Sequence, residues 1–195
     1  GTLNGMEFDN VEKLMAGNTL NDSLTGLNQL SGWQINVDGN NTYTSAGRQL
    51  SFSGFDILKG GLQADVFALA DGAGFDGLLD GQGGKDSLDW SAETAAVRVS
   101  LSGFGQVDGW AGAFGLAGVF WNIDEVLGSG HSGDVLQGAN LPNTWIIGSV
   151  NTLSSGGHIL NWSGFEVLQG GTGVDVYVLP SQGGAAFAGV VDGGA

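Results

Sequence analysis

Two stretches of the sequence, about 112 residues apart, match one another position by position. FDNVEKLMAGNTLNDSLTGLNQLSGWQI from Phe8 aligns with FWNIDEVLGSGHSGDVLQGANLPNTWII from Phe120. After a two-residue deletion, FSGFDILKGGLQADVFAL from Phe52 aligns with WSGFEVLQGGTGVDVYVL from Trp162. The chain therefore holds about one and three-quarter copies of a long unit, copy 1 over about 8–119 and a partial copy 2 over about 120–195. We expect one continuous domain over 1–195.

A shorter rhythm runs inside the long unit. Short apolar clusters with period-2 alternation recur about every 22 residues, each bounded by Gly, Asn, Asp or Ser, which is typical of strands ended by turns. The 3.6-residue period of a long helix is missing. This pattern predicts an all-β, parallel β-solenoid (β-helix) with about nine coils of roughly 22 residues. A barrel or a β-sandwich is the alternative, but neither fold requires identity at long range.

Composition limits the partners of the chain. The chain has 38 glycines and 42% hydrophobic residues, so it is turn-rich and too apolar to be disordered. The formal charge of −15 disfavours nucleic acid and anionic lipid surfaces as partners. The least polar run, residues 110–121, is too short and too rich in glycine to span a bilayer, so we expect no membrane insertion. There is no cysteine, which excludes disulfides and thiolate metal sites.

Glycine turns followed by aspartate are the motif that carries most chemistry. GGTGVDVYV from Gly170 fits the pattern G-G-x-G-x-D-x-(apolar)-x, and GGLQADVFA from Gly60 and GQGGKDSLD from Gly81 are looser versions. This pattern resembles the nonapeptide repeat of the RTX, or haemolysin-type calcium-binding, proteins secreted by bacteria. In that family the aspartate carboxylate and the turn carbonyls hold calcium between stacked turns, and hard oxygen ligands suit this ion. The resemblance implies Asp65, Asp86 and Asp175 as metal ligands.

The spacing of the motifs departs from that family, whose repeats run in tandem every nine residues. Here the motifs are intermittent, and stacked coils would bring together only Asp65, Asp86 and Asp108, which follow one another after 21 and 22 residues. Stacked carboxylates repel, so a cation lies between them, they point into water, or they accept N–H bonds of the turns. An aspartate after glycines is also an ordinary turn residue. We therefore expect no required cofactor, with calcium as the candidate ion.

Enzyme signatures are weak. His131 and His158 are far apart and follow no catalytic spacing, and there is no G-x-S-x-G. Acidic pairs such as Asp124/Glu125 are read as solvated surface charge. We expect that the chain is not an enzyme, although a polysaccharide-active β-helix is a third alternative. Recurring aromatic residues, such as Trp33 and Trp145, are expected to form a core stack, whereas Trp90, Trp110 and Trp121 have no counterpart in the other copy.

Long-period repetition in an acidic, cysteine-free chain resembles the repetitive surface proteins and adhesins of bacteria. Neither end of the sequence reads as a cap, which favours a segment of a longer protein. The leading hypothesis is a structural module of an extracellular bacterial fibre, filament or surface layer, stacking end to end with further copies of itself. The alternative is a calcium-dependent adhesin or secreted RTX-type domain that binds a glycan or host partner.

Overall fold

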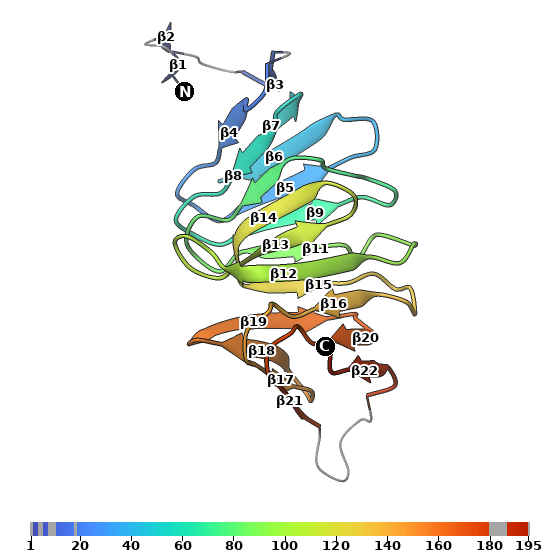
Figure 1. The fold of residues 1–195 in the computed structure, drawn as a ribbon. Helices are drawn as coiled ribbons and strands as arrows, with labels where there is room; N and C mark the ends of the chain where they lie inside the picture. Colours follow the sequence, from blue (N-terminus) through green and yellow to red (C-terminus); the bar gives the residue numbers. More distant parts are fainter. Residues whose placement is uncertain (1, 4–5, 8–10, 18, 180–186, 195) are drawn as a thin grey trace.

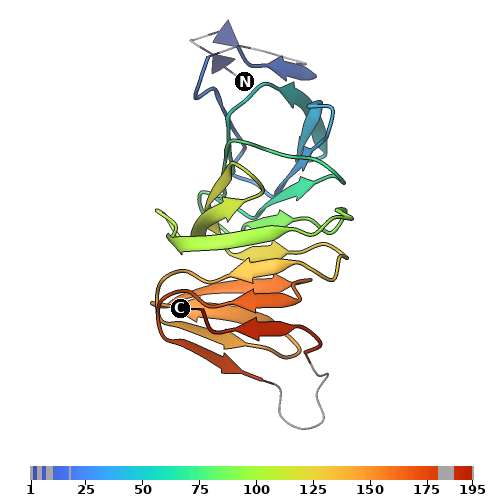
Figure 2. The same ribbon diagram turned by 45° about the vertical axis from the view of Figure 1, so that its right-hand side comes forward.

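The computed structural model describes residues 2–3, 6–7, 11–17, 19–179 and 187–194 of the chain. Phe8 and Asn10, two matched positions of the long repeat, lie outside these residues, as do parts of both terminal segments. The regular elements in the described part are all β-strands, as the sequence predicts. Two large sheets run along the molecule, with the N-terminal strands at one end and the C-terminal strands at the other (Figure 1, Figure 2). None of these residues forms a helix that would be long and apolar enough to cross a membrane.

The spatial order of the strands in each sheet differs from their order along the chain. The eleven-stranded sheet consists of β21 (Asp175–Val178), β17 (Asn143–Ile146), β18 (Asn151–Ser155), β19 (His158–Ser163), β15 (Glu125–Leu127), β11 (Ser87–Asp89), β9 (Asp65–Leu69), β5 (Ser31–Ile35), β6 (Asn41–Ser45), β7 (Arg48–Ser53) and β3 (Lys13–Met15). The nine-stranded sheet consists of β22 (Val190–Asp192), β20 (Val167–Gln169), β16 (Val135–Gln137), β12 (Arg98–Phe104), β13 (Trp110–Phe114), β14 (Gly118–Ile123), β10 (Leu78–Asp80), β8 (Ile57–Lys59) and β4 (Ser23–Thr25). A separate antiparallel pair joins β1 (Thr2–Leu3) and β2 (Met6–Glu7).

Where the chain crosses from one sheet to the other after each strand, successive layers pair in parallel. The run β8, β9, β10, β11 alternates between the sheets, so β8 pairs with β10 and β9 pairs with β11. This register puts Leu58 beside Leu79 in one sheet and Phe67 beside Leu88 in the other, and all four side chains are fully buried. Because alternate residues of a strand face the same side, these ladders form a continuous core between the sheets.

Three antiparallel meanders interrupt the alternation. They are β5–β6–β7 and β17–β18–β19 in the eleven-stranded sheet, and β12–β13–β14 in the nine-stranded sheet. In the hairpin between β6 and β7, Ala46 and Gly47 have φ of 49° and 72°. Positive φ at both central residues matches the twist of a two-residue hairpin. The last strand of each meander pairs with the preceding layer and its first strand pairs with the following one.

The prediction of a regular parallel β-solenoid, or β-helix, with about nine coils of roughly 22 residues was wrong. Both large sheets are mixed, because each meander keeps the chain in one sheet for three strands. A constant spacing in sequence therefore does not correspond to a constant step along the molecule. The spacing predicts Trp33 and Ile57 in successive coils, for example, but Trp33 lies in β5 of the eleven-stranded sheet and Ile57 in β8 of the nine-stranded sheet.

Aromatic side chains of the two long copies occupy equivalent places in the core. The ring of Trp33 stacks on Phe67 with centroids 5.6 Å apart, and that of Trp145 stacks on Tyr177 at the same distance. The prediction of a core stack is thus confirmed for these pairs. Of the tryptophans without a counterpart, Trp90 and Trp110 are buried and Trp121 is 36% exposed. The recurrence of these stacks means that the same packing is built in both copies.

Glycines at the corners between strands allow the main chains of successive layers to touch. A Cβ on Gly61 would lie 2.0 Å from the carbonyl oxygen of Leu27, and one on Gly171 would lie 2.2 Å from that of Ala139. Neither glycine has a positive φ, so close approach and not backbone conformation requires glycine here. Layer packing therefore explains Gly61 and Gly171 of the G-G-x-G-x-D pattern, whereas Gly84, in the version from Gly81, also has a φ of 134°.

The close approach at the corners predicts the effect of adding one methyl group. We expect Gly61→Ala to lower the free energy of unfolding by about 2 kcal/mol or more, because the carbonyl of Leu27 must move away. Gly32→Ala is the matched control, because a Cβ on Gly32, within β5, has nothing within 4 Å. Urea unfolding of the two variants measures the difference. Equal stability of both variants would contradict the role of close approach.

Candidate metal centre

The aspartates of the glycine turns act mainly as acceptors for main-chain N–H groups. Asp65 Oδ2 accepts the N–H of Gly61 at 2.8 Å, and Asp175 Oδ2 accepts that of Gly171 at 3.0 Å. Their other oxygens accept side-chain donors: Asp65 Oδ1 binds Trp33 Nε1 at 3.1 Å, and Asp175 Oδ1 binds Asn143 Nδ2 at 2.7 Å. Both carboxylates thus use each oxygen in a hydrogen bond that orders a turn and the indole or amide beside it.

The structure brings together two of the three predicted metal ligands. The N–H of Asp65, which begins β9, donates to Asp86 Oδ1 at 2.8 Å, so these two side chains lie in successive layers. Asp175 begins β21, near the C-terminal end of the same sheet. Calcium binding at Asp65 and Asp175 stays a prediction. Asp86 differs from both, because further carboxylates approach it.

Asp86, Asp108 and Asp124 form one cluster. Each offers a carboxylate oxygen, and these oxygens all lie within 4.8 Å of one another. Asp86 immediately precedes β11, Asp108 lies in the loop between β12 and β13, and Asp124 lies between β14 and β15. Asp86 is fully buried and the other two are half-buried. The cluster therefore joins a glycine turn, a hairpin loop and a crossing between the sheets.

Main-chain amides hold one oxygen of each carboxylate in the cluster. Asp86 Oδ1 accepts the N–H of Asp65, Asp124 Oδ2 accepts the N–H of Asp86 at 3.1 Å, and Asp108 Oδ2 accepts the N–H of Gly84 at 3.4 Å. Among the described residues, Asp86 Oδ2 and Asp108 Oδ1 are buried and have no hydrogen-bond partner. Buried carboxylate oxygens without donors are costly, so the cluster has unused capacity to bind a positive charge.

A local change in the turn explains the free oxygen of Asp86. In the turns of Asp65 and Asp175, the second residue of the motif donates its N–H to the aspartate. In the turn of Asp86 that residue is Gln82, whose φ is 68° and whose N–H donates to Asp80 Oδ1 at 3.1 Å instead. Gln82 is in the left-handed region, and its amide is bonded to Asp80 and not to Asp86. Asp80 thus takes the donor that the other turns give to their own aspartate.

Asn122 positions the loop that carries Asp108. Its Oδ1 accepts the N–H of Val107 at 2.8 Å, and its Nδ2 donates to Asp80 Oδ1 at 2.6 Å. Asn122 is buried and has a φ of 57°, which asparagine tolerates better than most residues. The loop is thereby tied to the same turn that leaves Asp86 Oδ2 without an amide. The cluster is built by the turn, the loop and Asn122 together.

Burial and mutual repulsion disfavour the charged forms of these carboxyl groups. Burial raises the pKa of Asp86 to about 8, and the negative charges of Asp65, Asp124 and Asp108 also raise it. Burial raises the pKa values of Asp108 and Asp124 too. The cationic side chains that oppose this effect are His158, for Asp108 and Asp124, and Lys85, for Asp124. Without a cation or proton, the cluster carries uncompensated negative charge.

Sequence reasoning missed Asp124 and Asn122. The expectation of solvated surface charge at Asp124/Glu125 is wrong for Asp124, whose carboxylate is half-buried and accepts the N–H of Asp86. The long repeat does indicate such a role for a carboxylate, because Asp56 and Glu166 occupy matching positions of the two copies. Each accepts the N–H of a turn aspartate, Asp22 at 2.9 Å and Asp134 at 3.4 Å. A carboxylate next to the strand of the following layer is thus a recurrent partner of these turns.

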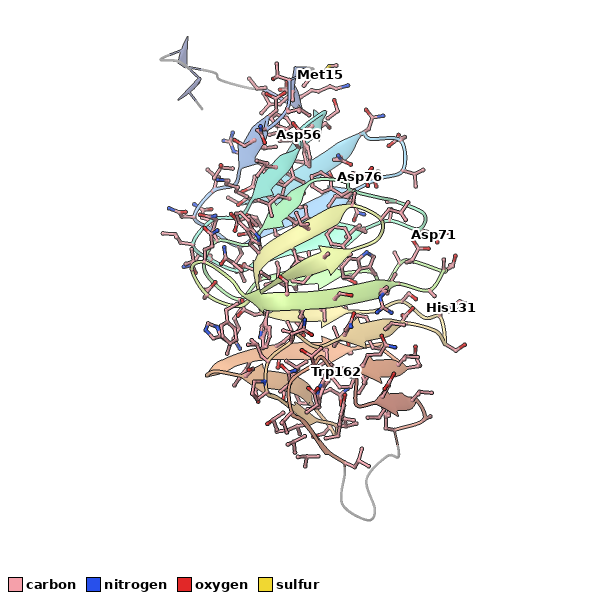
Figure 3. All side chains as sticks on the ribbon, in the orientation of Figure 1. Met15, Asp56, Asp71, Asp76, His131 and Trp162 are labelled. Atoms are coloured by element: carbon pink, nitrogen blue, oxygen red, sulfur yellow. The ribbon has the colours of Figure 1, made fainter. Side chains whose placement is uncertain are left out.

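A surface cleft elsewhere is not part of this cluster. It has a volume of about 340 Å³ and lies beside Asp76, which is labelled in Figure 3, with Trp90, Glu93 and Arg98 also in its lining. Two of its charged groups already make structural hydrogen bonds: Glu93 Oε2 accepts the N–H of Gly72 at 2.8 Å, and Arg98 donates to Gln137 at 2.9 Å. These bonds give Glu93 and Arg98 a structural role.

Comparisons of the chain with protein-family models, with curated proteins and with solved structures found no match. The likeness of the glycine turns to the RTX repeat therefore rests on the quoted residues alone and stays a prediction.

The raised pKa of Asp86 predicts how stability depends on pH when divalent cations are absent. The pKa rises from 3.8 to about 8 on folding, so within this window the folded protein holds more protons than the unfolded chain. The free energy of unfolding should therefore fall as pH rises through the window. Hydrogen bonds to Asn40 and to Thr94 lower the pKa values of Asp38 and Asp71, so these two groups change the free energy of unfolding only below this pH window.

Urea unfolding in EDTA at a series of pH values measures this slope. Asp86→Asn removes one titrating group and keeps an oxygen for the N–H of Asp65, so the variant should show a smaller slope and exceed the wild type in stability above about pH 8. The slope that remains comes from Asp65, Asp108 and Asp124, whose pKa values burial also raises. The same slope in both proteins would contradict the assignment to Asp86.

Proposed function

We propose that the chain is a structural module of an extracellular bacterial fibre, filament or surface layer, and that it stacks end to end with further copies of its long repeat. The proposal is supported by the edges of the two sheets. Among the described residues, no strand pairs with the outer edges of β3 and β4 at one end or of β21 and β22 at the other. Unpaired strand edges are templates for another chain segment.

Each strand with a free edge corresponds to a strand in the other copy of the repeat, and there the equivalent edge is paired. Residues of β3 and β4 correspond, at the repeat offset, to those of β15 and β16, which pair with β11 and β12 on that side. Residues of β21 and β22 correspond to those of β9 and β10, which pair with β11 and β14. The segment that covers both kinds of edge inside the molecule therefore spans β11 to β14.

The match at the C-terminal edge extends to individual contacts. GVVDG from Gly189 repeats GLLDG from Gly77, and a Cβ on either first glycine would lie 2.0 Å from a main-chain carbonyl, of Glu166 or of Asp56. The N–H of Gly194 donates to Asp192 Oδ1 at 3.1 Å, just as that of Gln82 donates to Asp80 Oδ1. In these contacts, the free edge of β22 thus resembles the edge of β10 that pairs with β14.

The occupant that fits this end is a segment equivalent to β11–β14 in a further copy of the repeat. A strand like β11 would pair with β21, and a strand like β14 would pair with β22. Neither edge strand contains Lys, Arg or Pro, residues that block edge pairing in many proteins, and Val176 and Val190 are 50% and 59% exposed. The single observation that carries the proposal is this equivalence of free and paired edges.

The bacterial surface location belongs to the same proposal. It is supported by the repetition, the acidic composition and the absence of cysteine, which together are typical of extended surface proteins. We include no enzymatic activity in the proposal, and no nucleic acid partner.

The calcium-dependent adhesin is the second candidate, and the carboxylate cluster is the observation that favours it. A large loss of β-sheet signal on chelation would support this alternative, whereas a fold that persists in EDTA would argue that calcium has a local role. Binding of a glycan or host partner would have to be measured separately.

Edge pairing predicts self-association that depends on β21. We expect the wild-type chain to form end-to-end oligomers that grow with concentration, and Val176→Lys to weaken this association by about tenfold or more, because lysine on an edge strand opposes pairing. Val66→Lys is the matched control: Val66 is the counterpart of Val176 and is 41% exposed, but β9 is paired on both sides. Sedimentation velocity over a range of concentrations measures the effect.

Two results would contradict the proposal. One is a wild-type chain that remains monomeric up to its solubility limit. The other is an equal loss of association in Val66→Lys and Val176→Lys, which would place the contact on a sheet face and not at the edge.

A further inference from the structure

We propose that Asp86, Asp108 and Asp124 bind a calcium ion that ties the turn before β11, the loop between β12 and β13 and the crossing from β14 to β15 to one another. This inference does not depend on the proposed function. It also differs from the site that the glycine-turn motif suggests, because Asp108 and Asp124 belong to no such motif and Asp65 and Asp175 take no part.

The first argument is that the three carboxylates are already held in place. Each uses one oxygen to accept a main-chain N–H, from Asp65, Gly84 or Asp86. No hydrogen bond from another described residue reaches the second oxygen of any of the three. Ligands that are fixed before binding lose little conformational entropy when they bind an ion.

The second argument comes from the other turns of the same chain. Asp65, Asp134 and Asp175 each direct Oδ2 to an amide of their own turn, at 2.8, 2.6 and 3.0 Å. Asp86 Oδ2 has no partner among the described residues although Asp86 is fully buried, a state that it shares with the buried Oδ2 of Asp22, a turn aspartate of the first copy. Among the described residues, only at Asp86 do two further carboxylates approach closely enough to share an ion. A missing donor and added acceptors in one place are what a cation requires.

The third argument concerns size and chemistry. Two oxygens that bind one calcium ion at 2.3–2.6 Å can be at most about 5 Å apart, and the three oxygens here lie within 4.8 Å of one another. Magnesium takes the same kind of ligand at about 2.1 Å but demands near-ideal octahedral geometry. Carboxylates are hard ligands, and an irregular, partly buried site suits the flexible coordination of calcium. Water or main-chain carbonyls would complete the coordination.

The charge around the site supports the same assignment. Two basic side chains lower the pKa values of carboxyl groups in the cluster: Lys85 acts on Asp124, and His158 acts on Asp108 and Asp124. Neither of them acts on Asp86. Asp65, in the next layer, adds a further carboxyl group beside Asp86. A divalent ion would neutralise most of this charge and relieve the repulsion among the buried oxygens.

The test is calcium binding by the full chain after treatment with EDTA and exchange into metal-free buffer. Isothermal titration with calcium chloride at about pH 7.5 should show one ion bound per chain, with a dissociation constant of roughly 10⁻⁵ to 10⁻³ M. Saturating calcium should raise the melting temperature by about 5 °C, and magnesium should have a smaller effect.

Three variants locate the site. Asp86→Asn and Asp124→Asn should each weaken calcium binding at least about tenfold, because each removes one charged ligand. Asp175→Asn is the matched control from an equivalent turn and should bind calcium as the wild type does. Circular dichroism in EDTA establishes that each variant is folded. Since two different ligands are changed, the test holds even if one of these variants does not fold.

The proposal fails if the wild type shows neither binding heat nor a change in melting temperature at about 10 mM calcium, an upper range for extracellular sites. It also fails if Asp175→Asn loses calcium binding while Asp86→Asn and Asp124→Asn retain it. That result would return the ion to the glycine-turn motif.

Discussion

At the corners between the sheets, the main chains of successive layers are in close contact, and this contact determines how the layers stack. At Gly61 and Gly171 no side chain fits, because the carbonyl oxygen of another layer occupies the position of a Cβ. This contact brings turn amides of one layer next to carboxylates of the next, as in the bond from the N–H of Asp65 to Asp86. The core ladders between the sheets follow from the same stacking, since layers in register place like residues side by side.

The carboxylate cluster is the place where this common corner is altered. Gln82 directs its amide to Asp80, the β12–β14 meander delivers Asp108, and the following crossing delivers Asp124. Each change is small, yet together they leave buried oxygens of Asp86 and Asp108 without donors among the described residues. The other corners only stabilise the fold, whereas this corner also has free carboxylate oxygens that could bind an ion. The open sheet edges, by contrast, arise from the repeat as a whole.

The sequence predicted the strands and the lack of long helices, because alternation and turn residues are local signals. The arrangement of the strands was missed because each apolar cluster was counted as one coil. The two-residue turns at Ala46–Gly47 and Gly156–Gly157, which have positive φ, mark hairpins that break such a count. Asp65 and Asp108 do lie near Asp86, but Asp108 reaches it through the β12–β14 meander and not through a following coil of about 22 residues. Asp124 follows the same meander, which no short period reveals.

The most direct test of the calcium site is an X-ray structure of the chain crystallised with calcium, with the ion located by its anomalous scattering. We expect an ion ligated by Asp86, Asp108 and Asp124 at about 2.3–2.6 Å from the carboxylate oxygens, with Asp65 and Asp175 still bonded to their turn amides. An ion held by Asp65 or Asp175, or none at the cluster in saturating calcium, would contradict the proposed site.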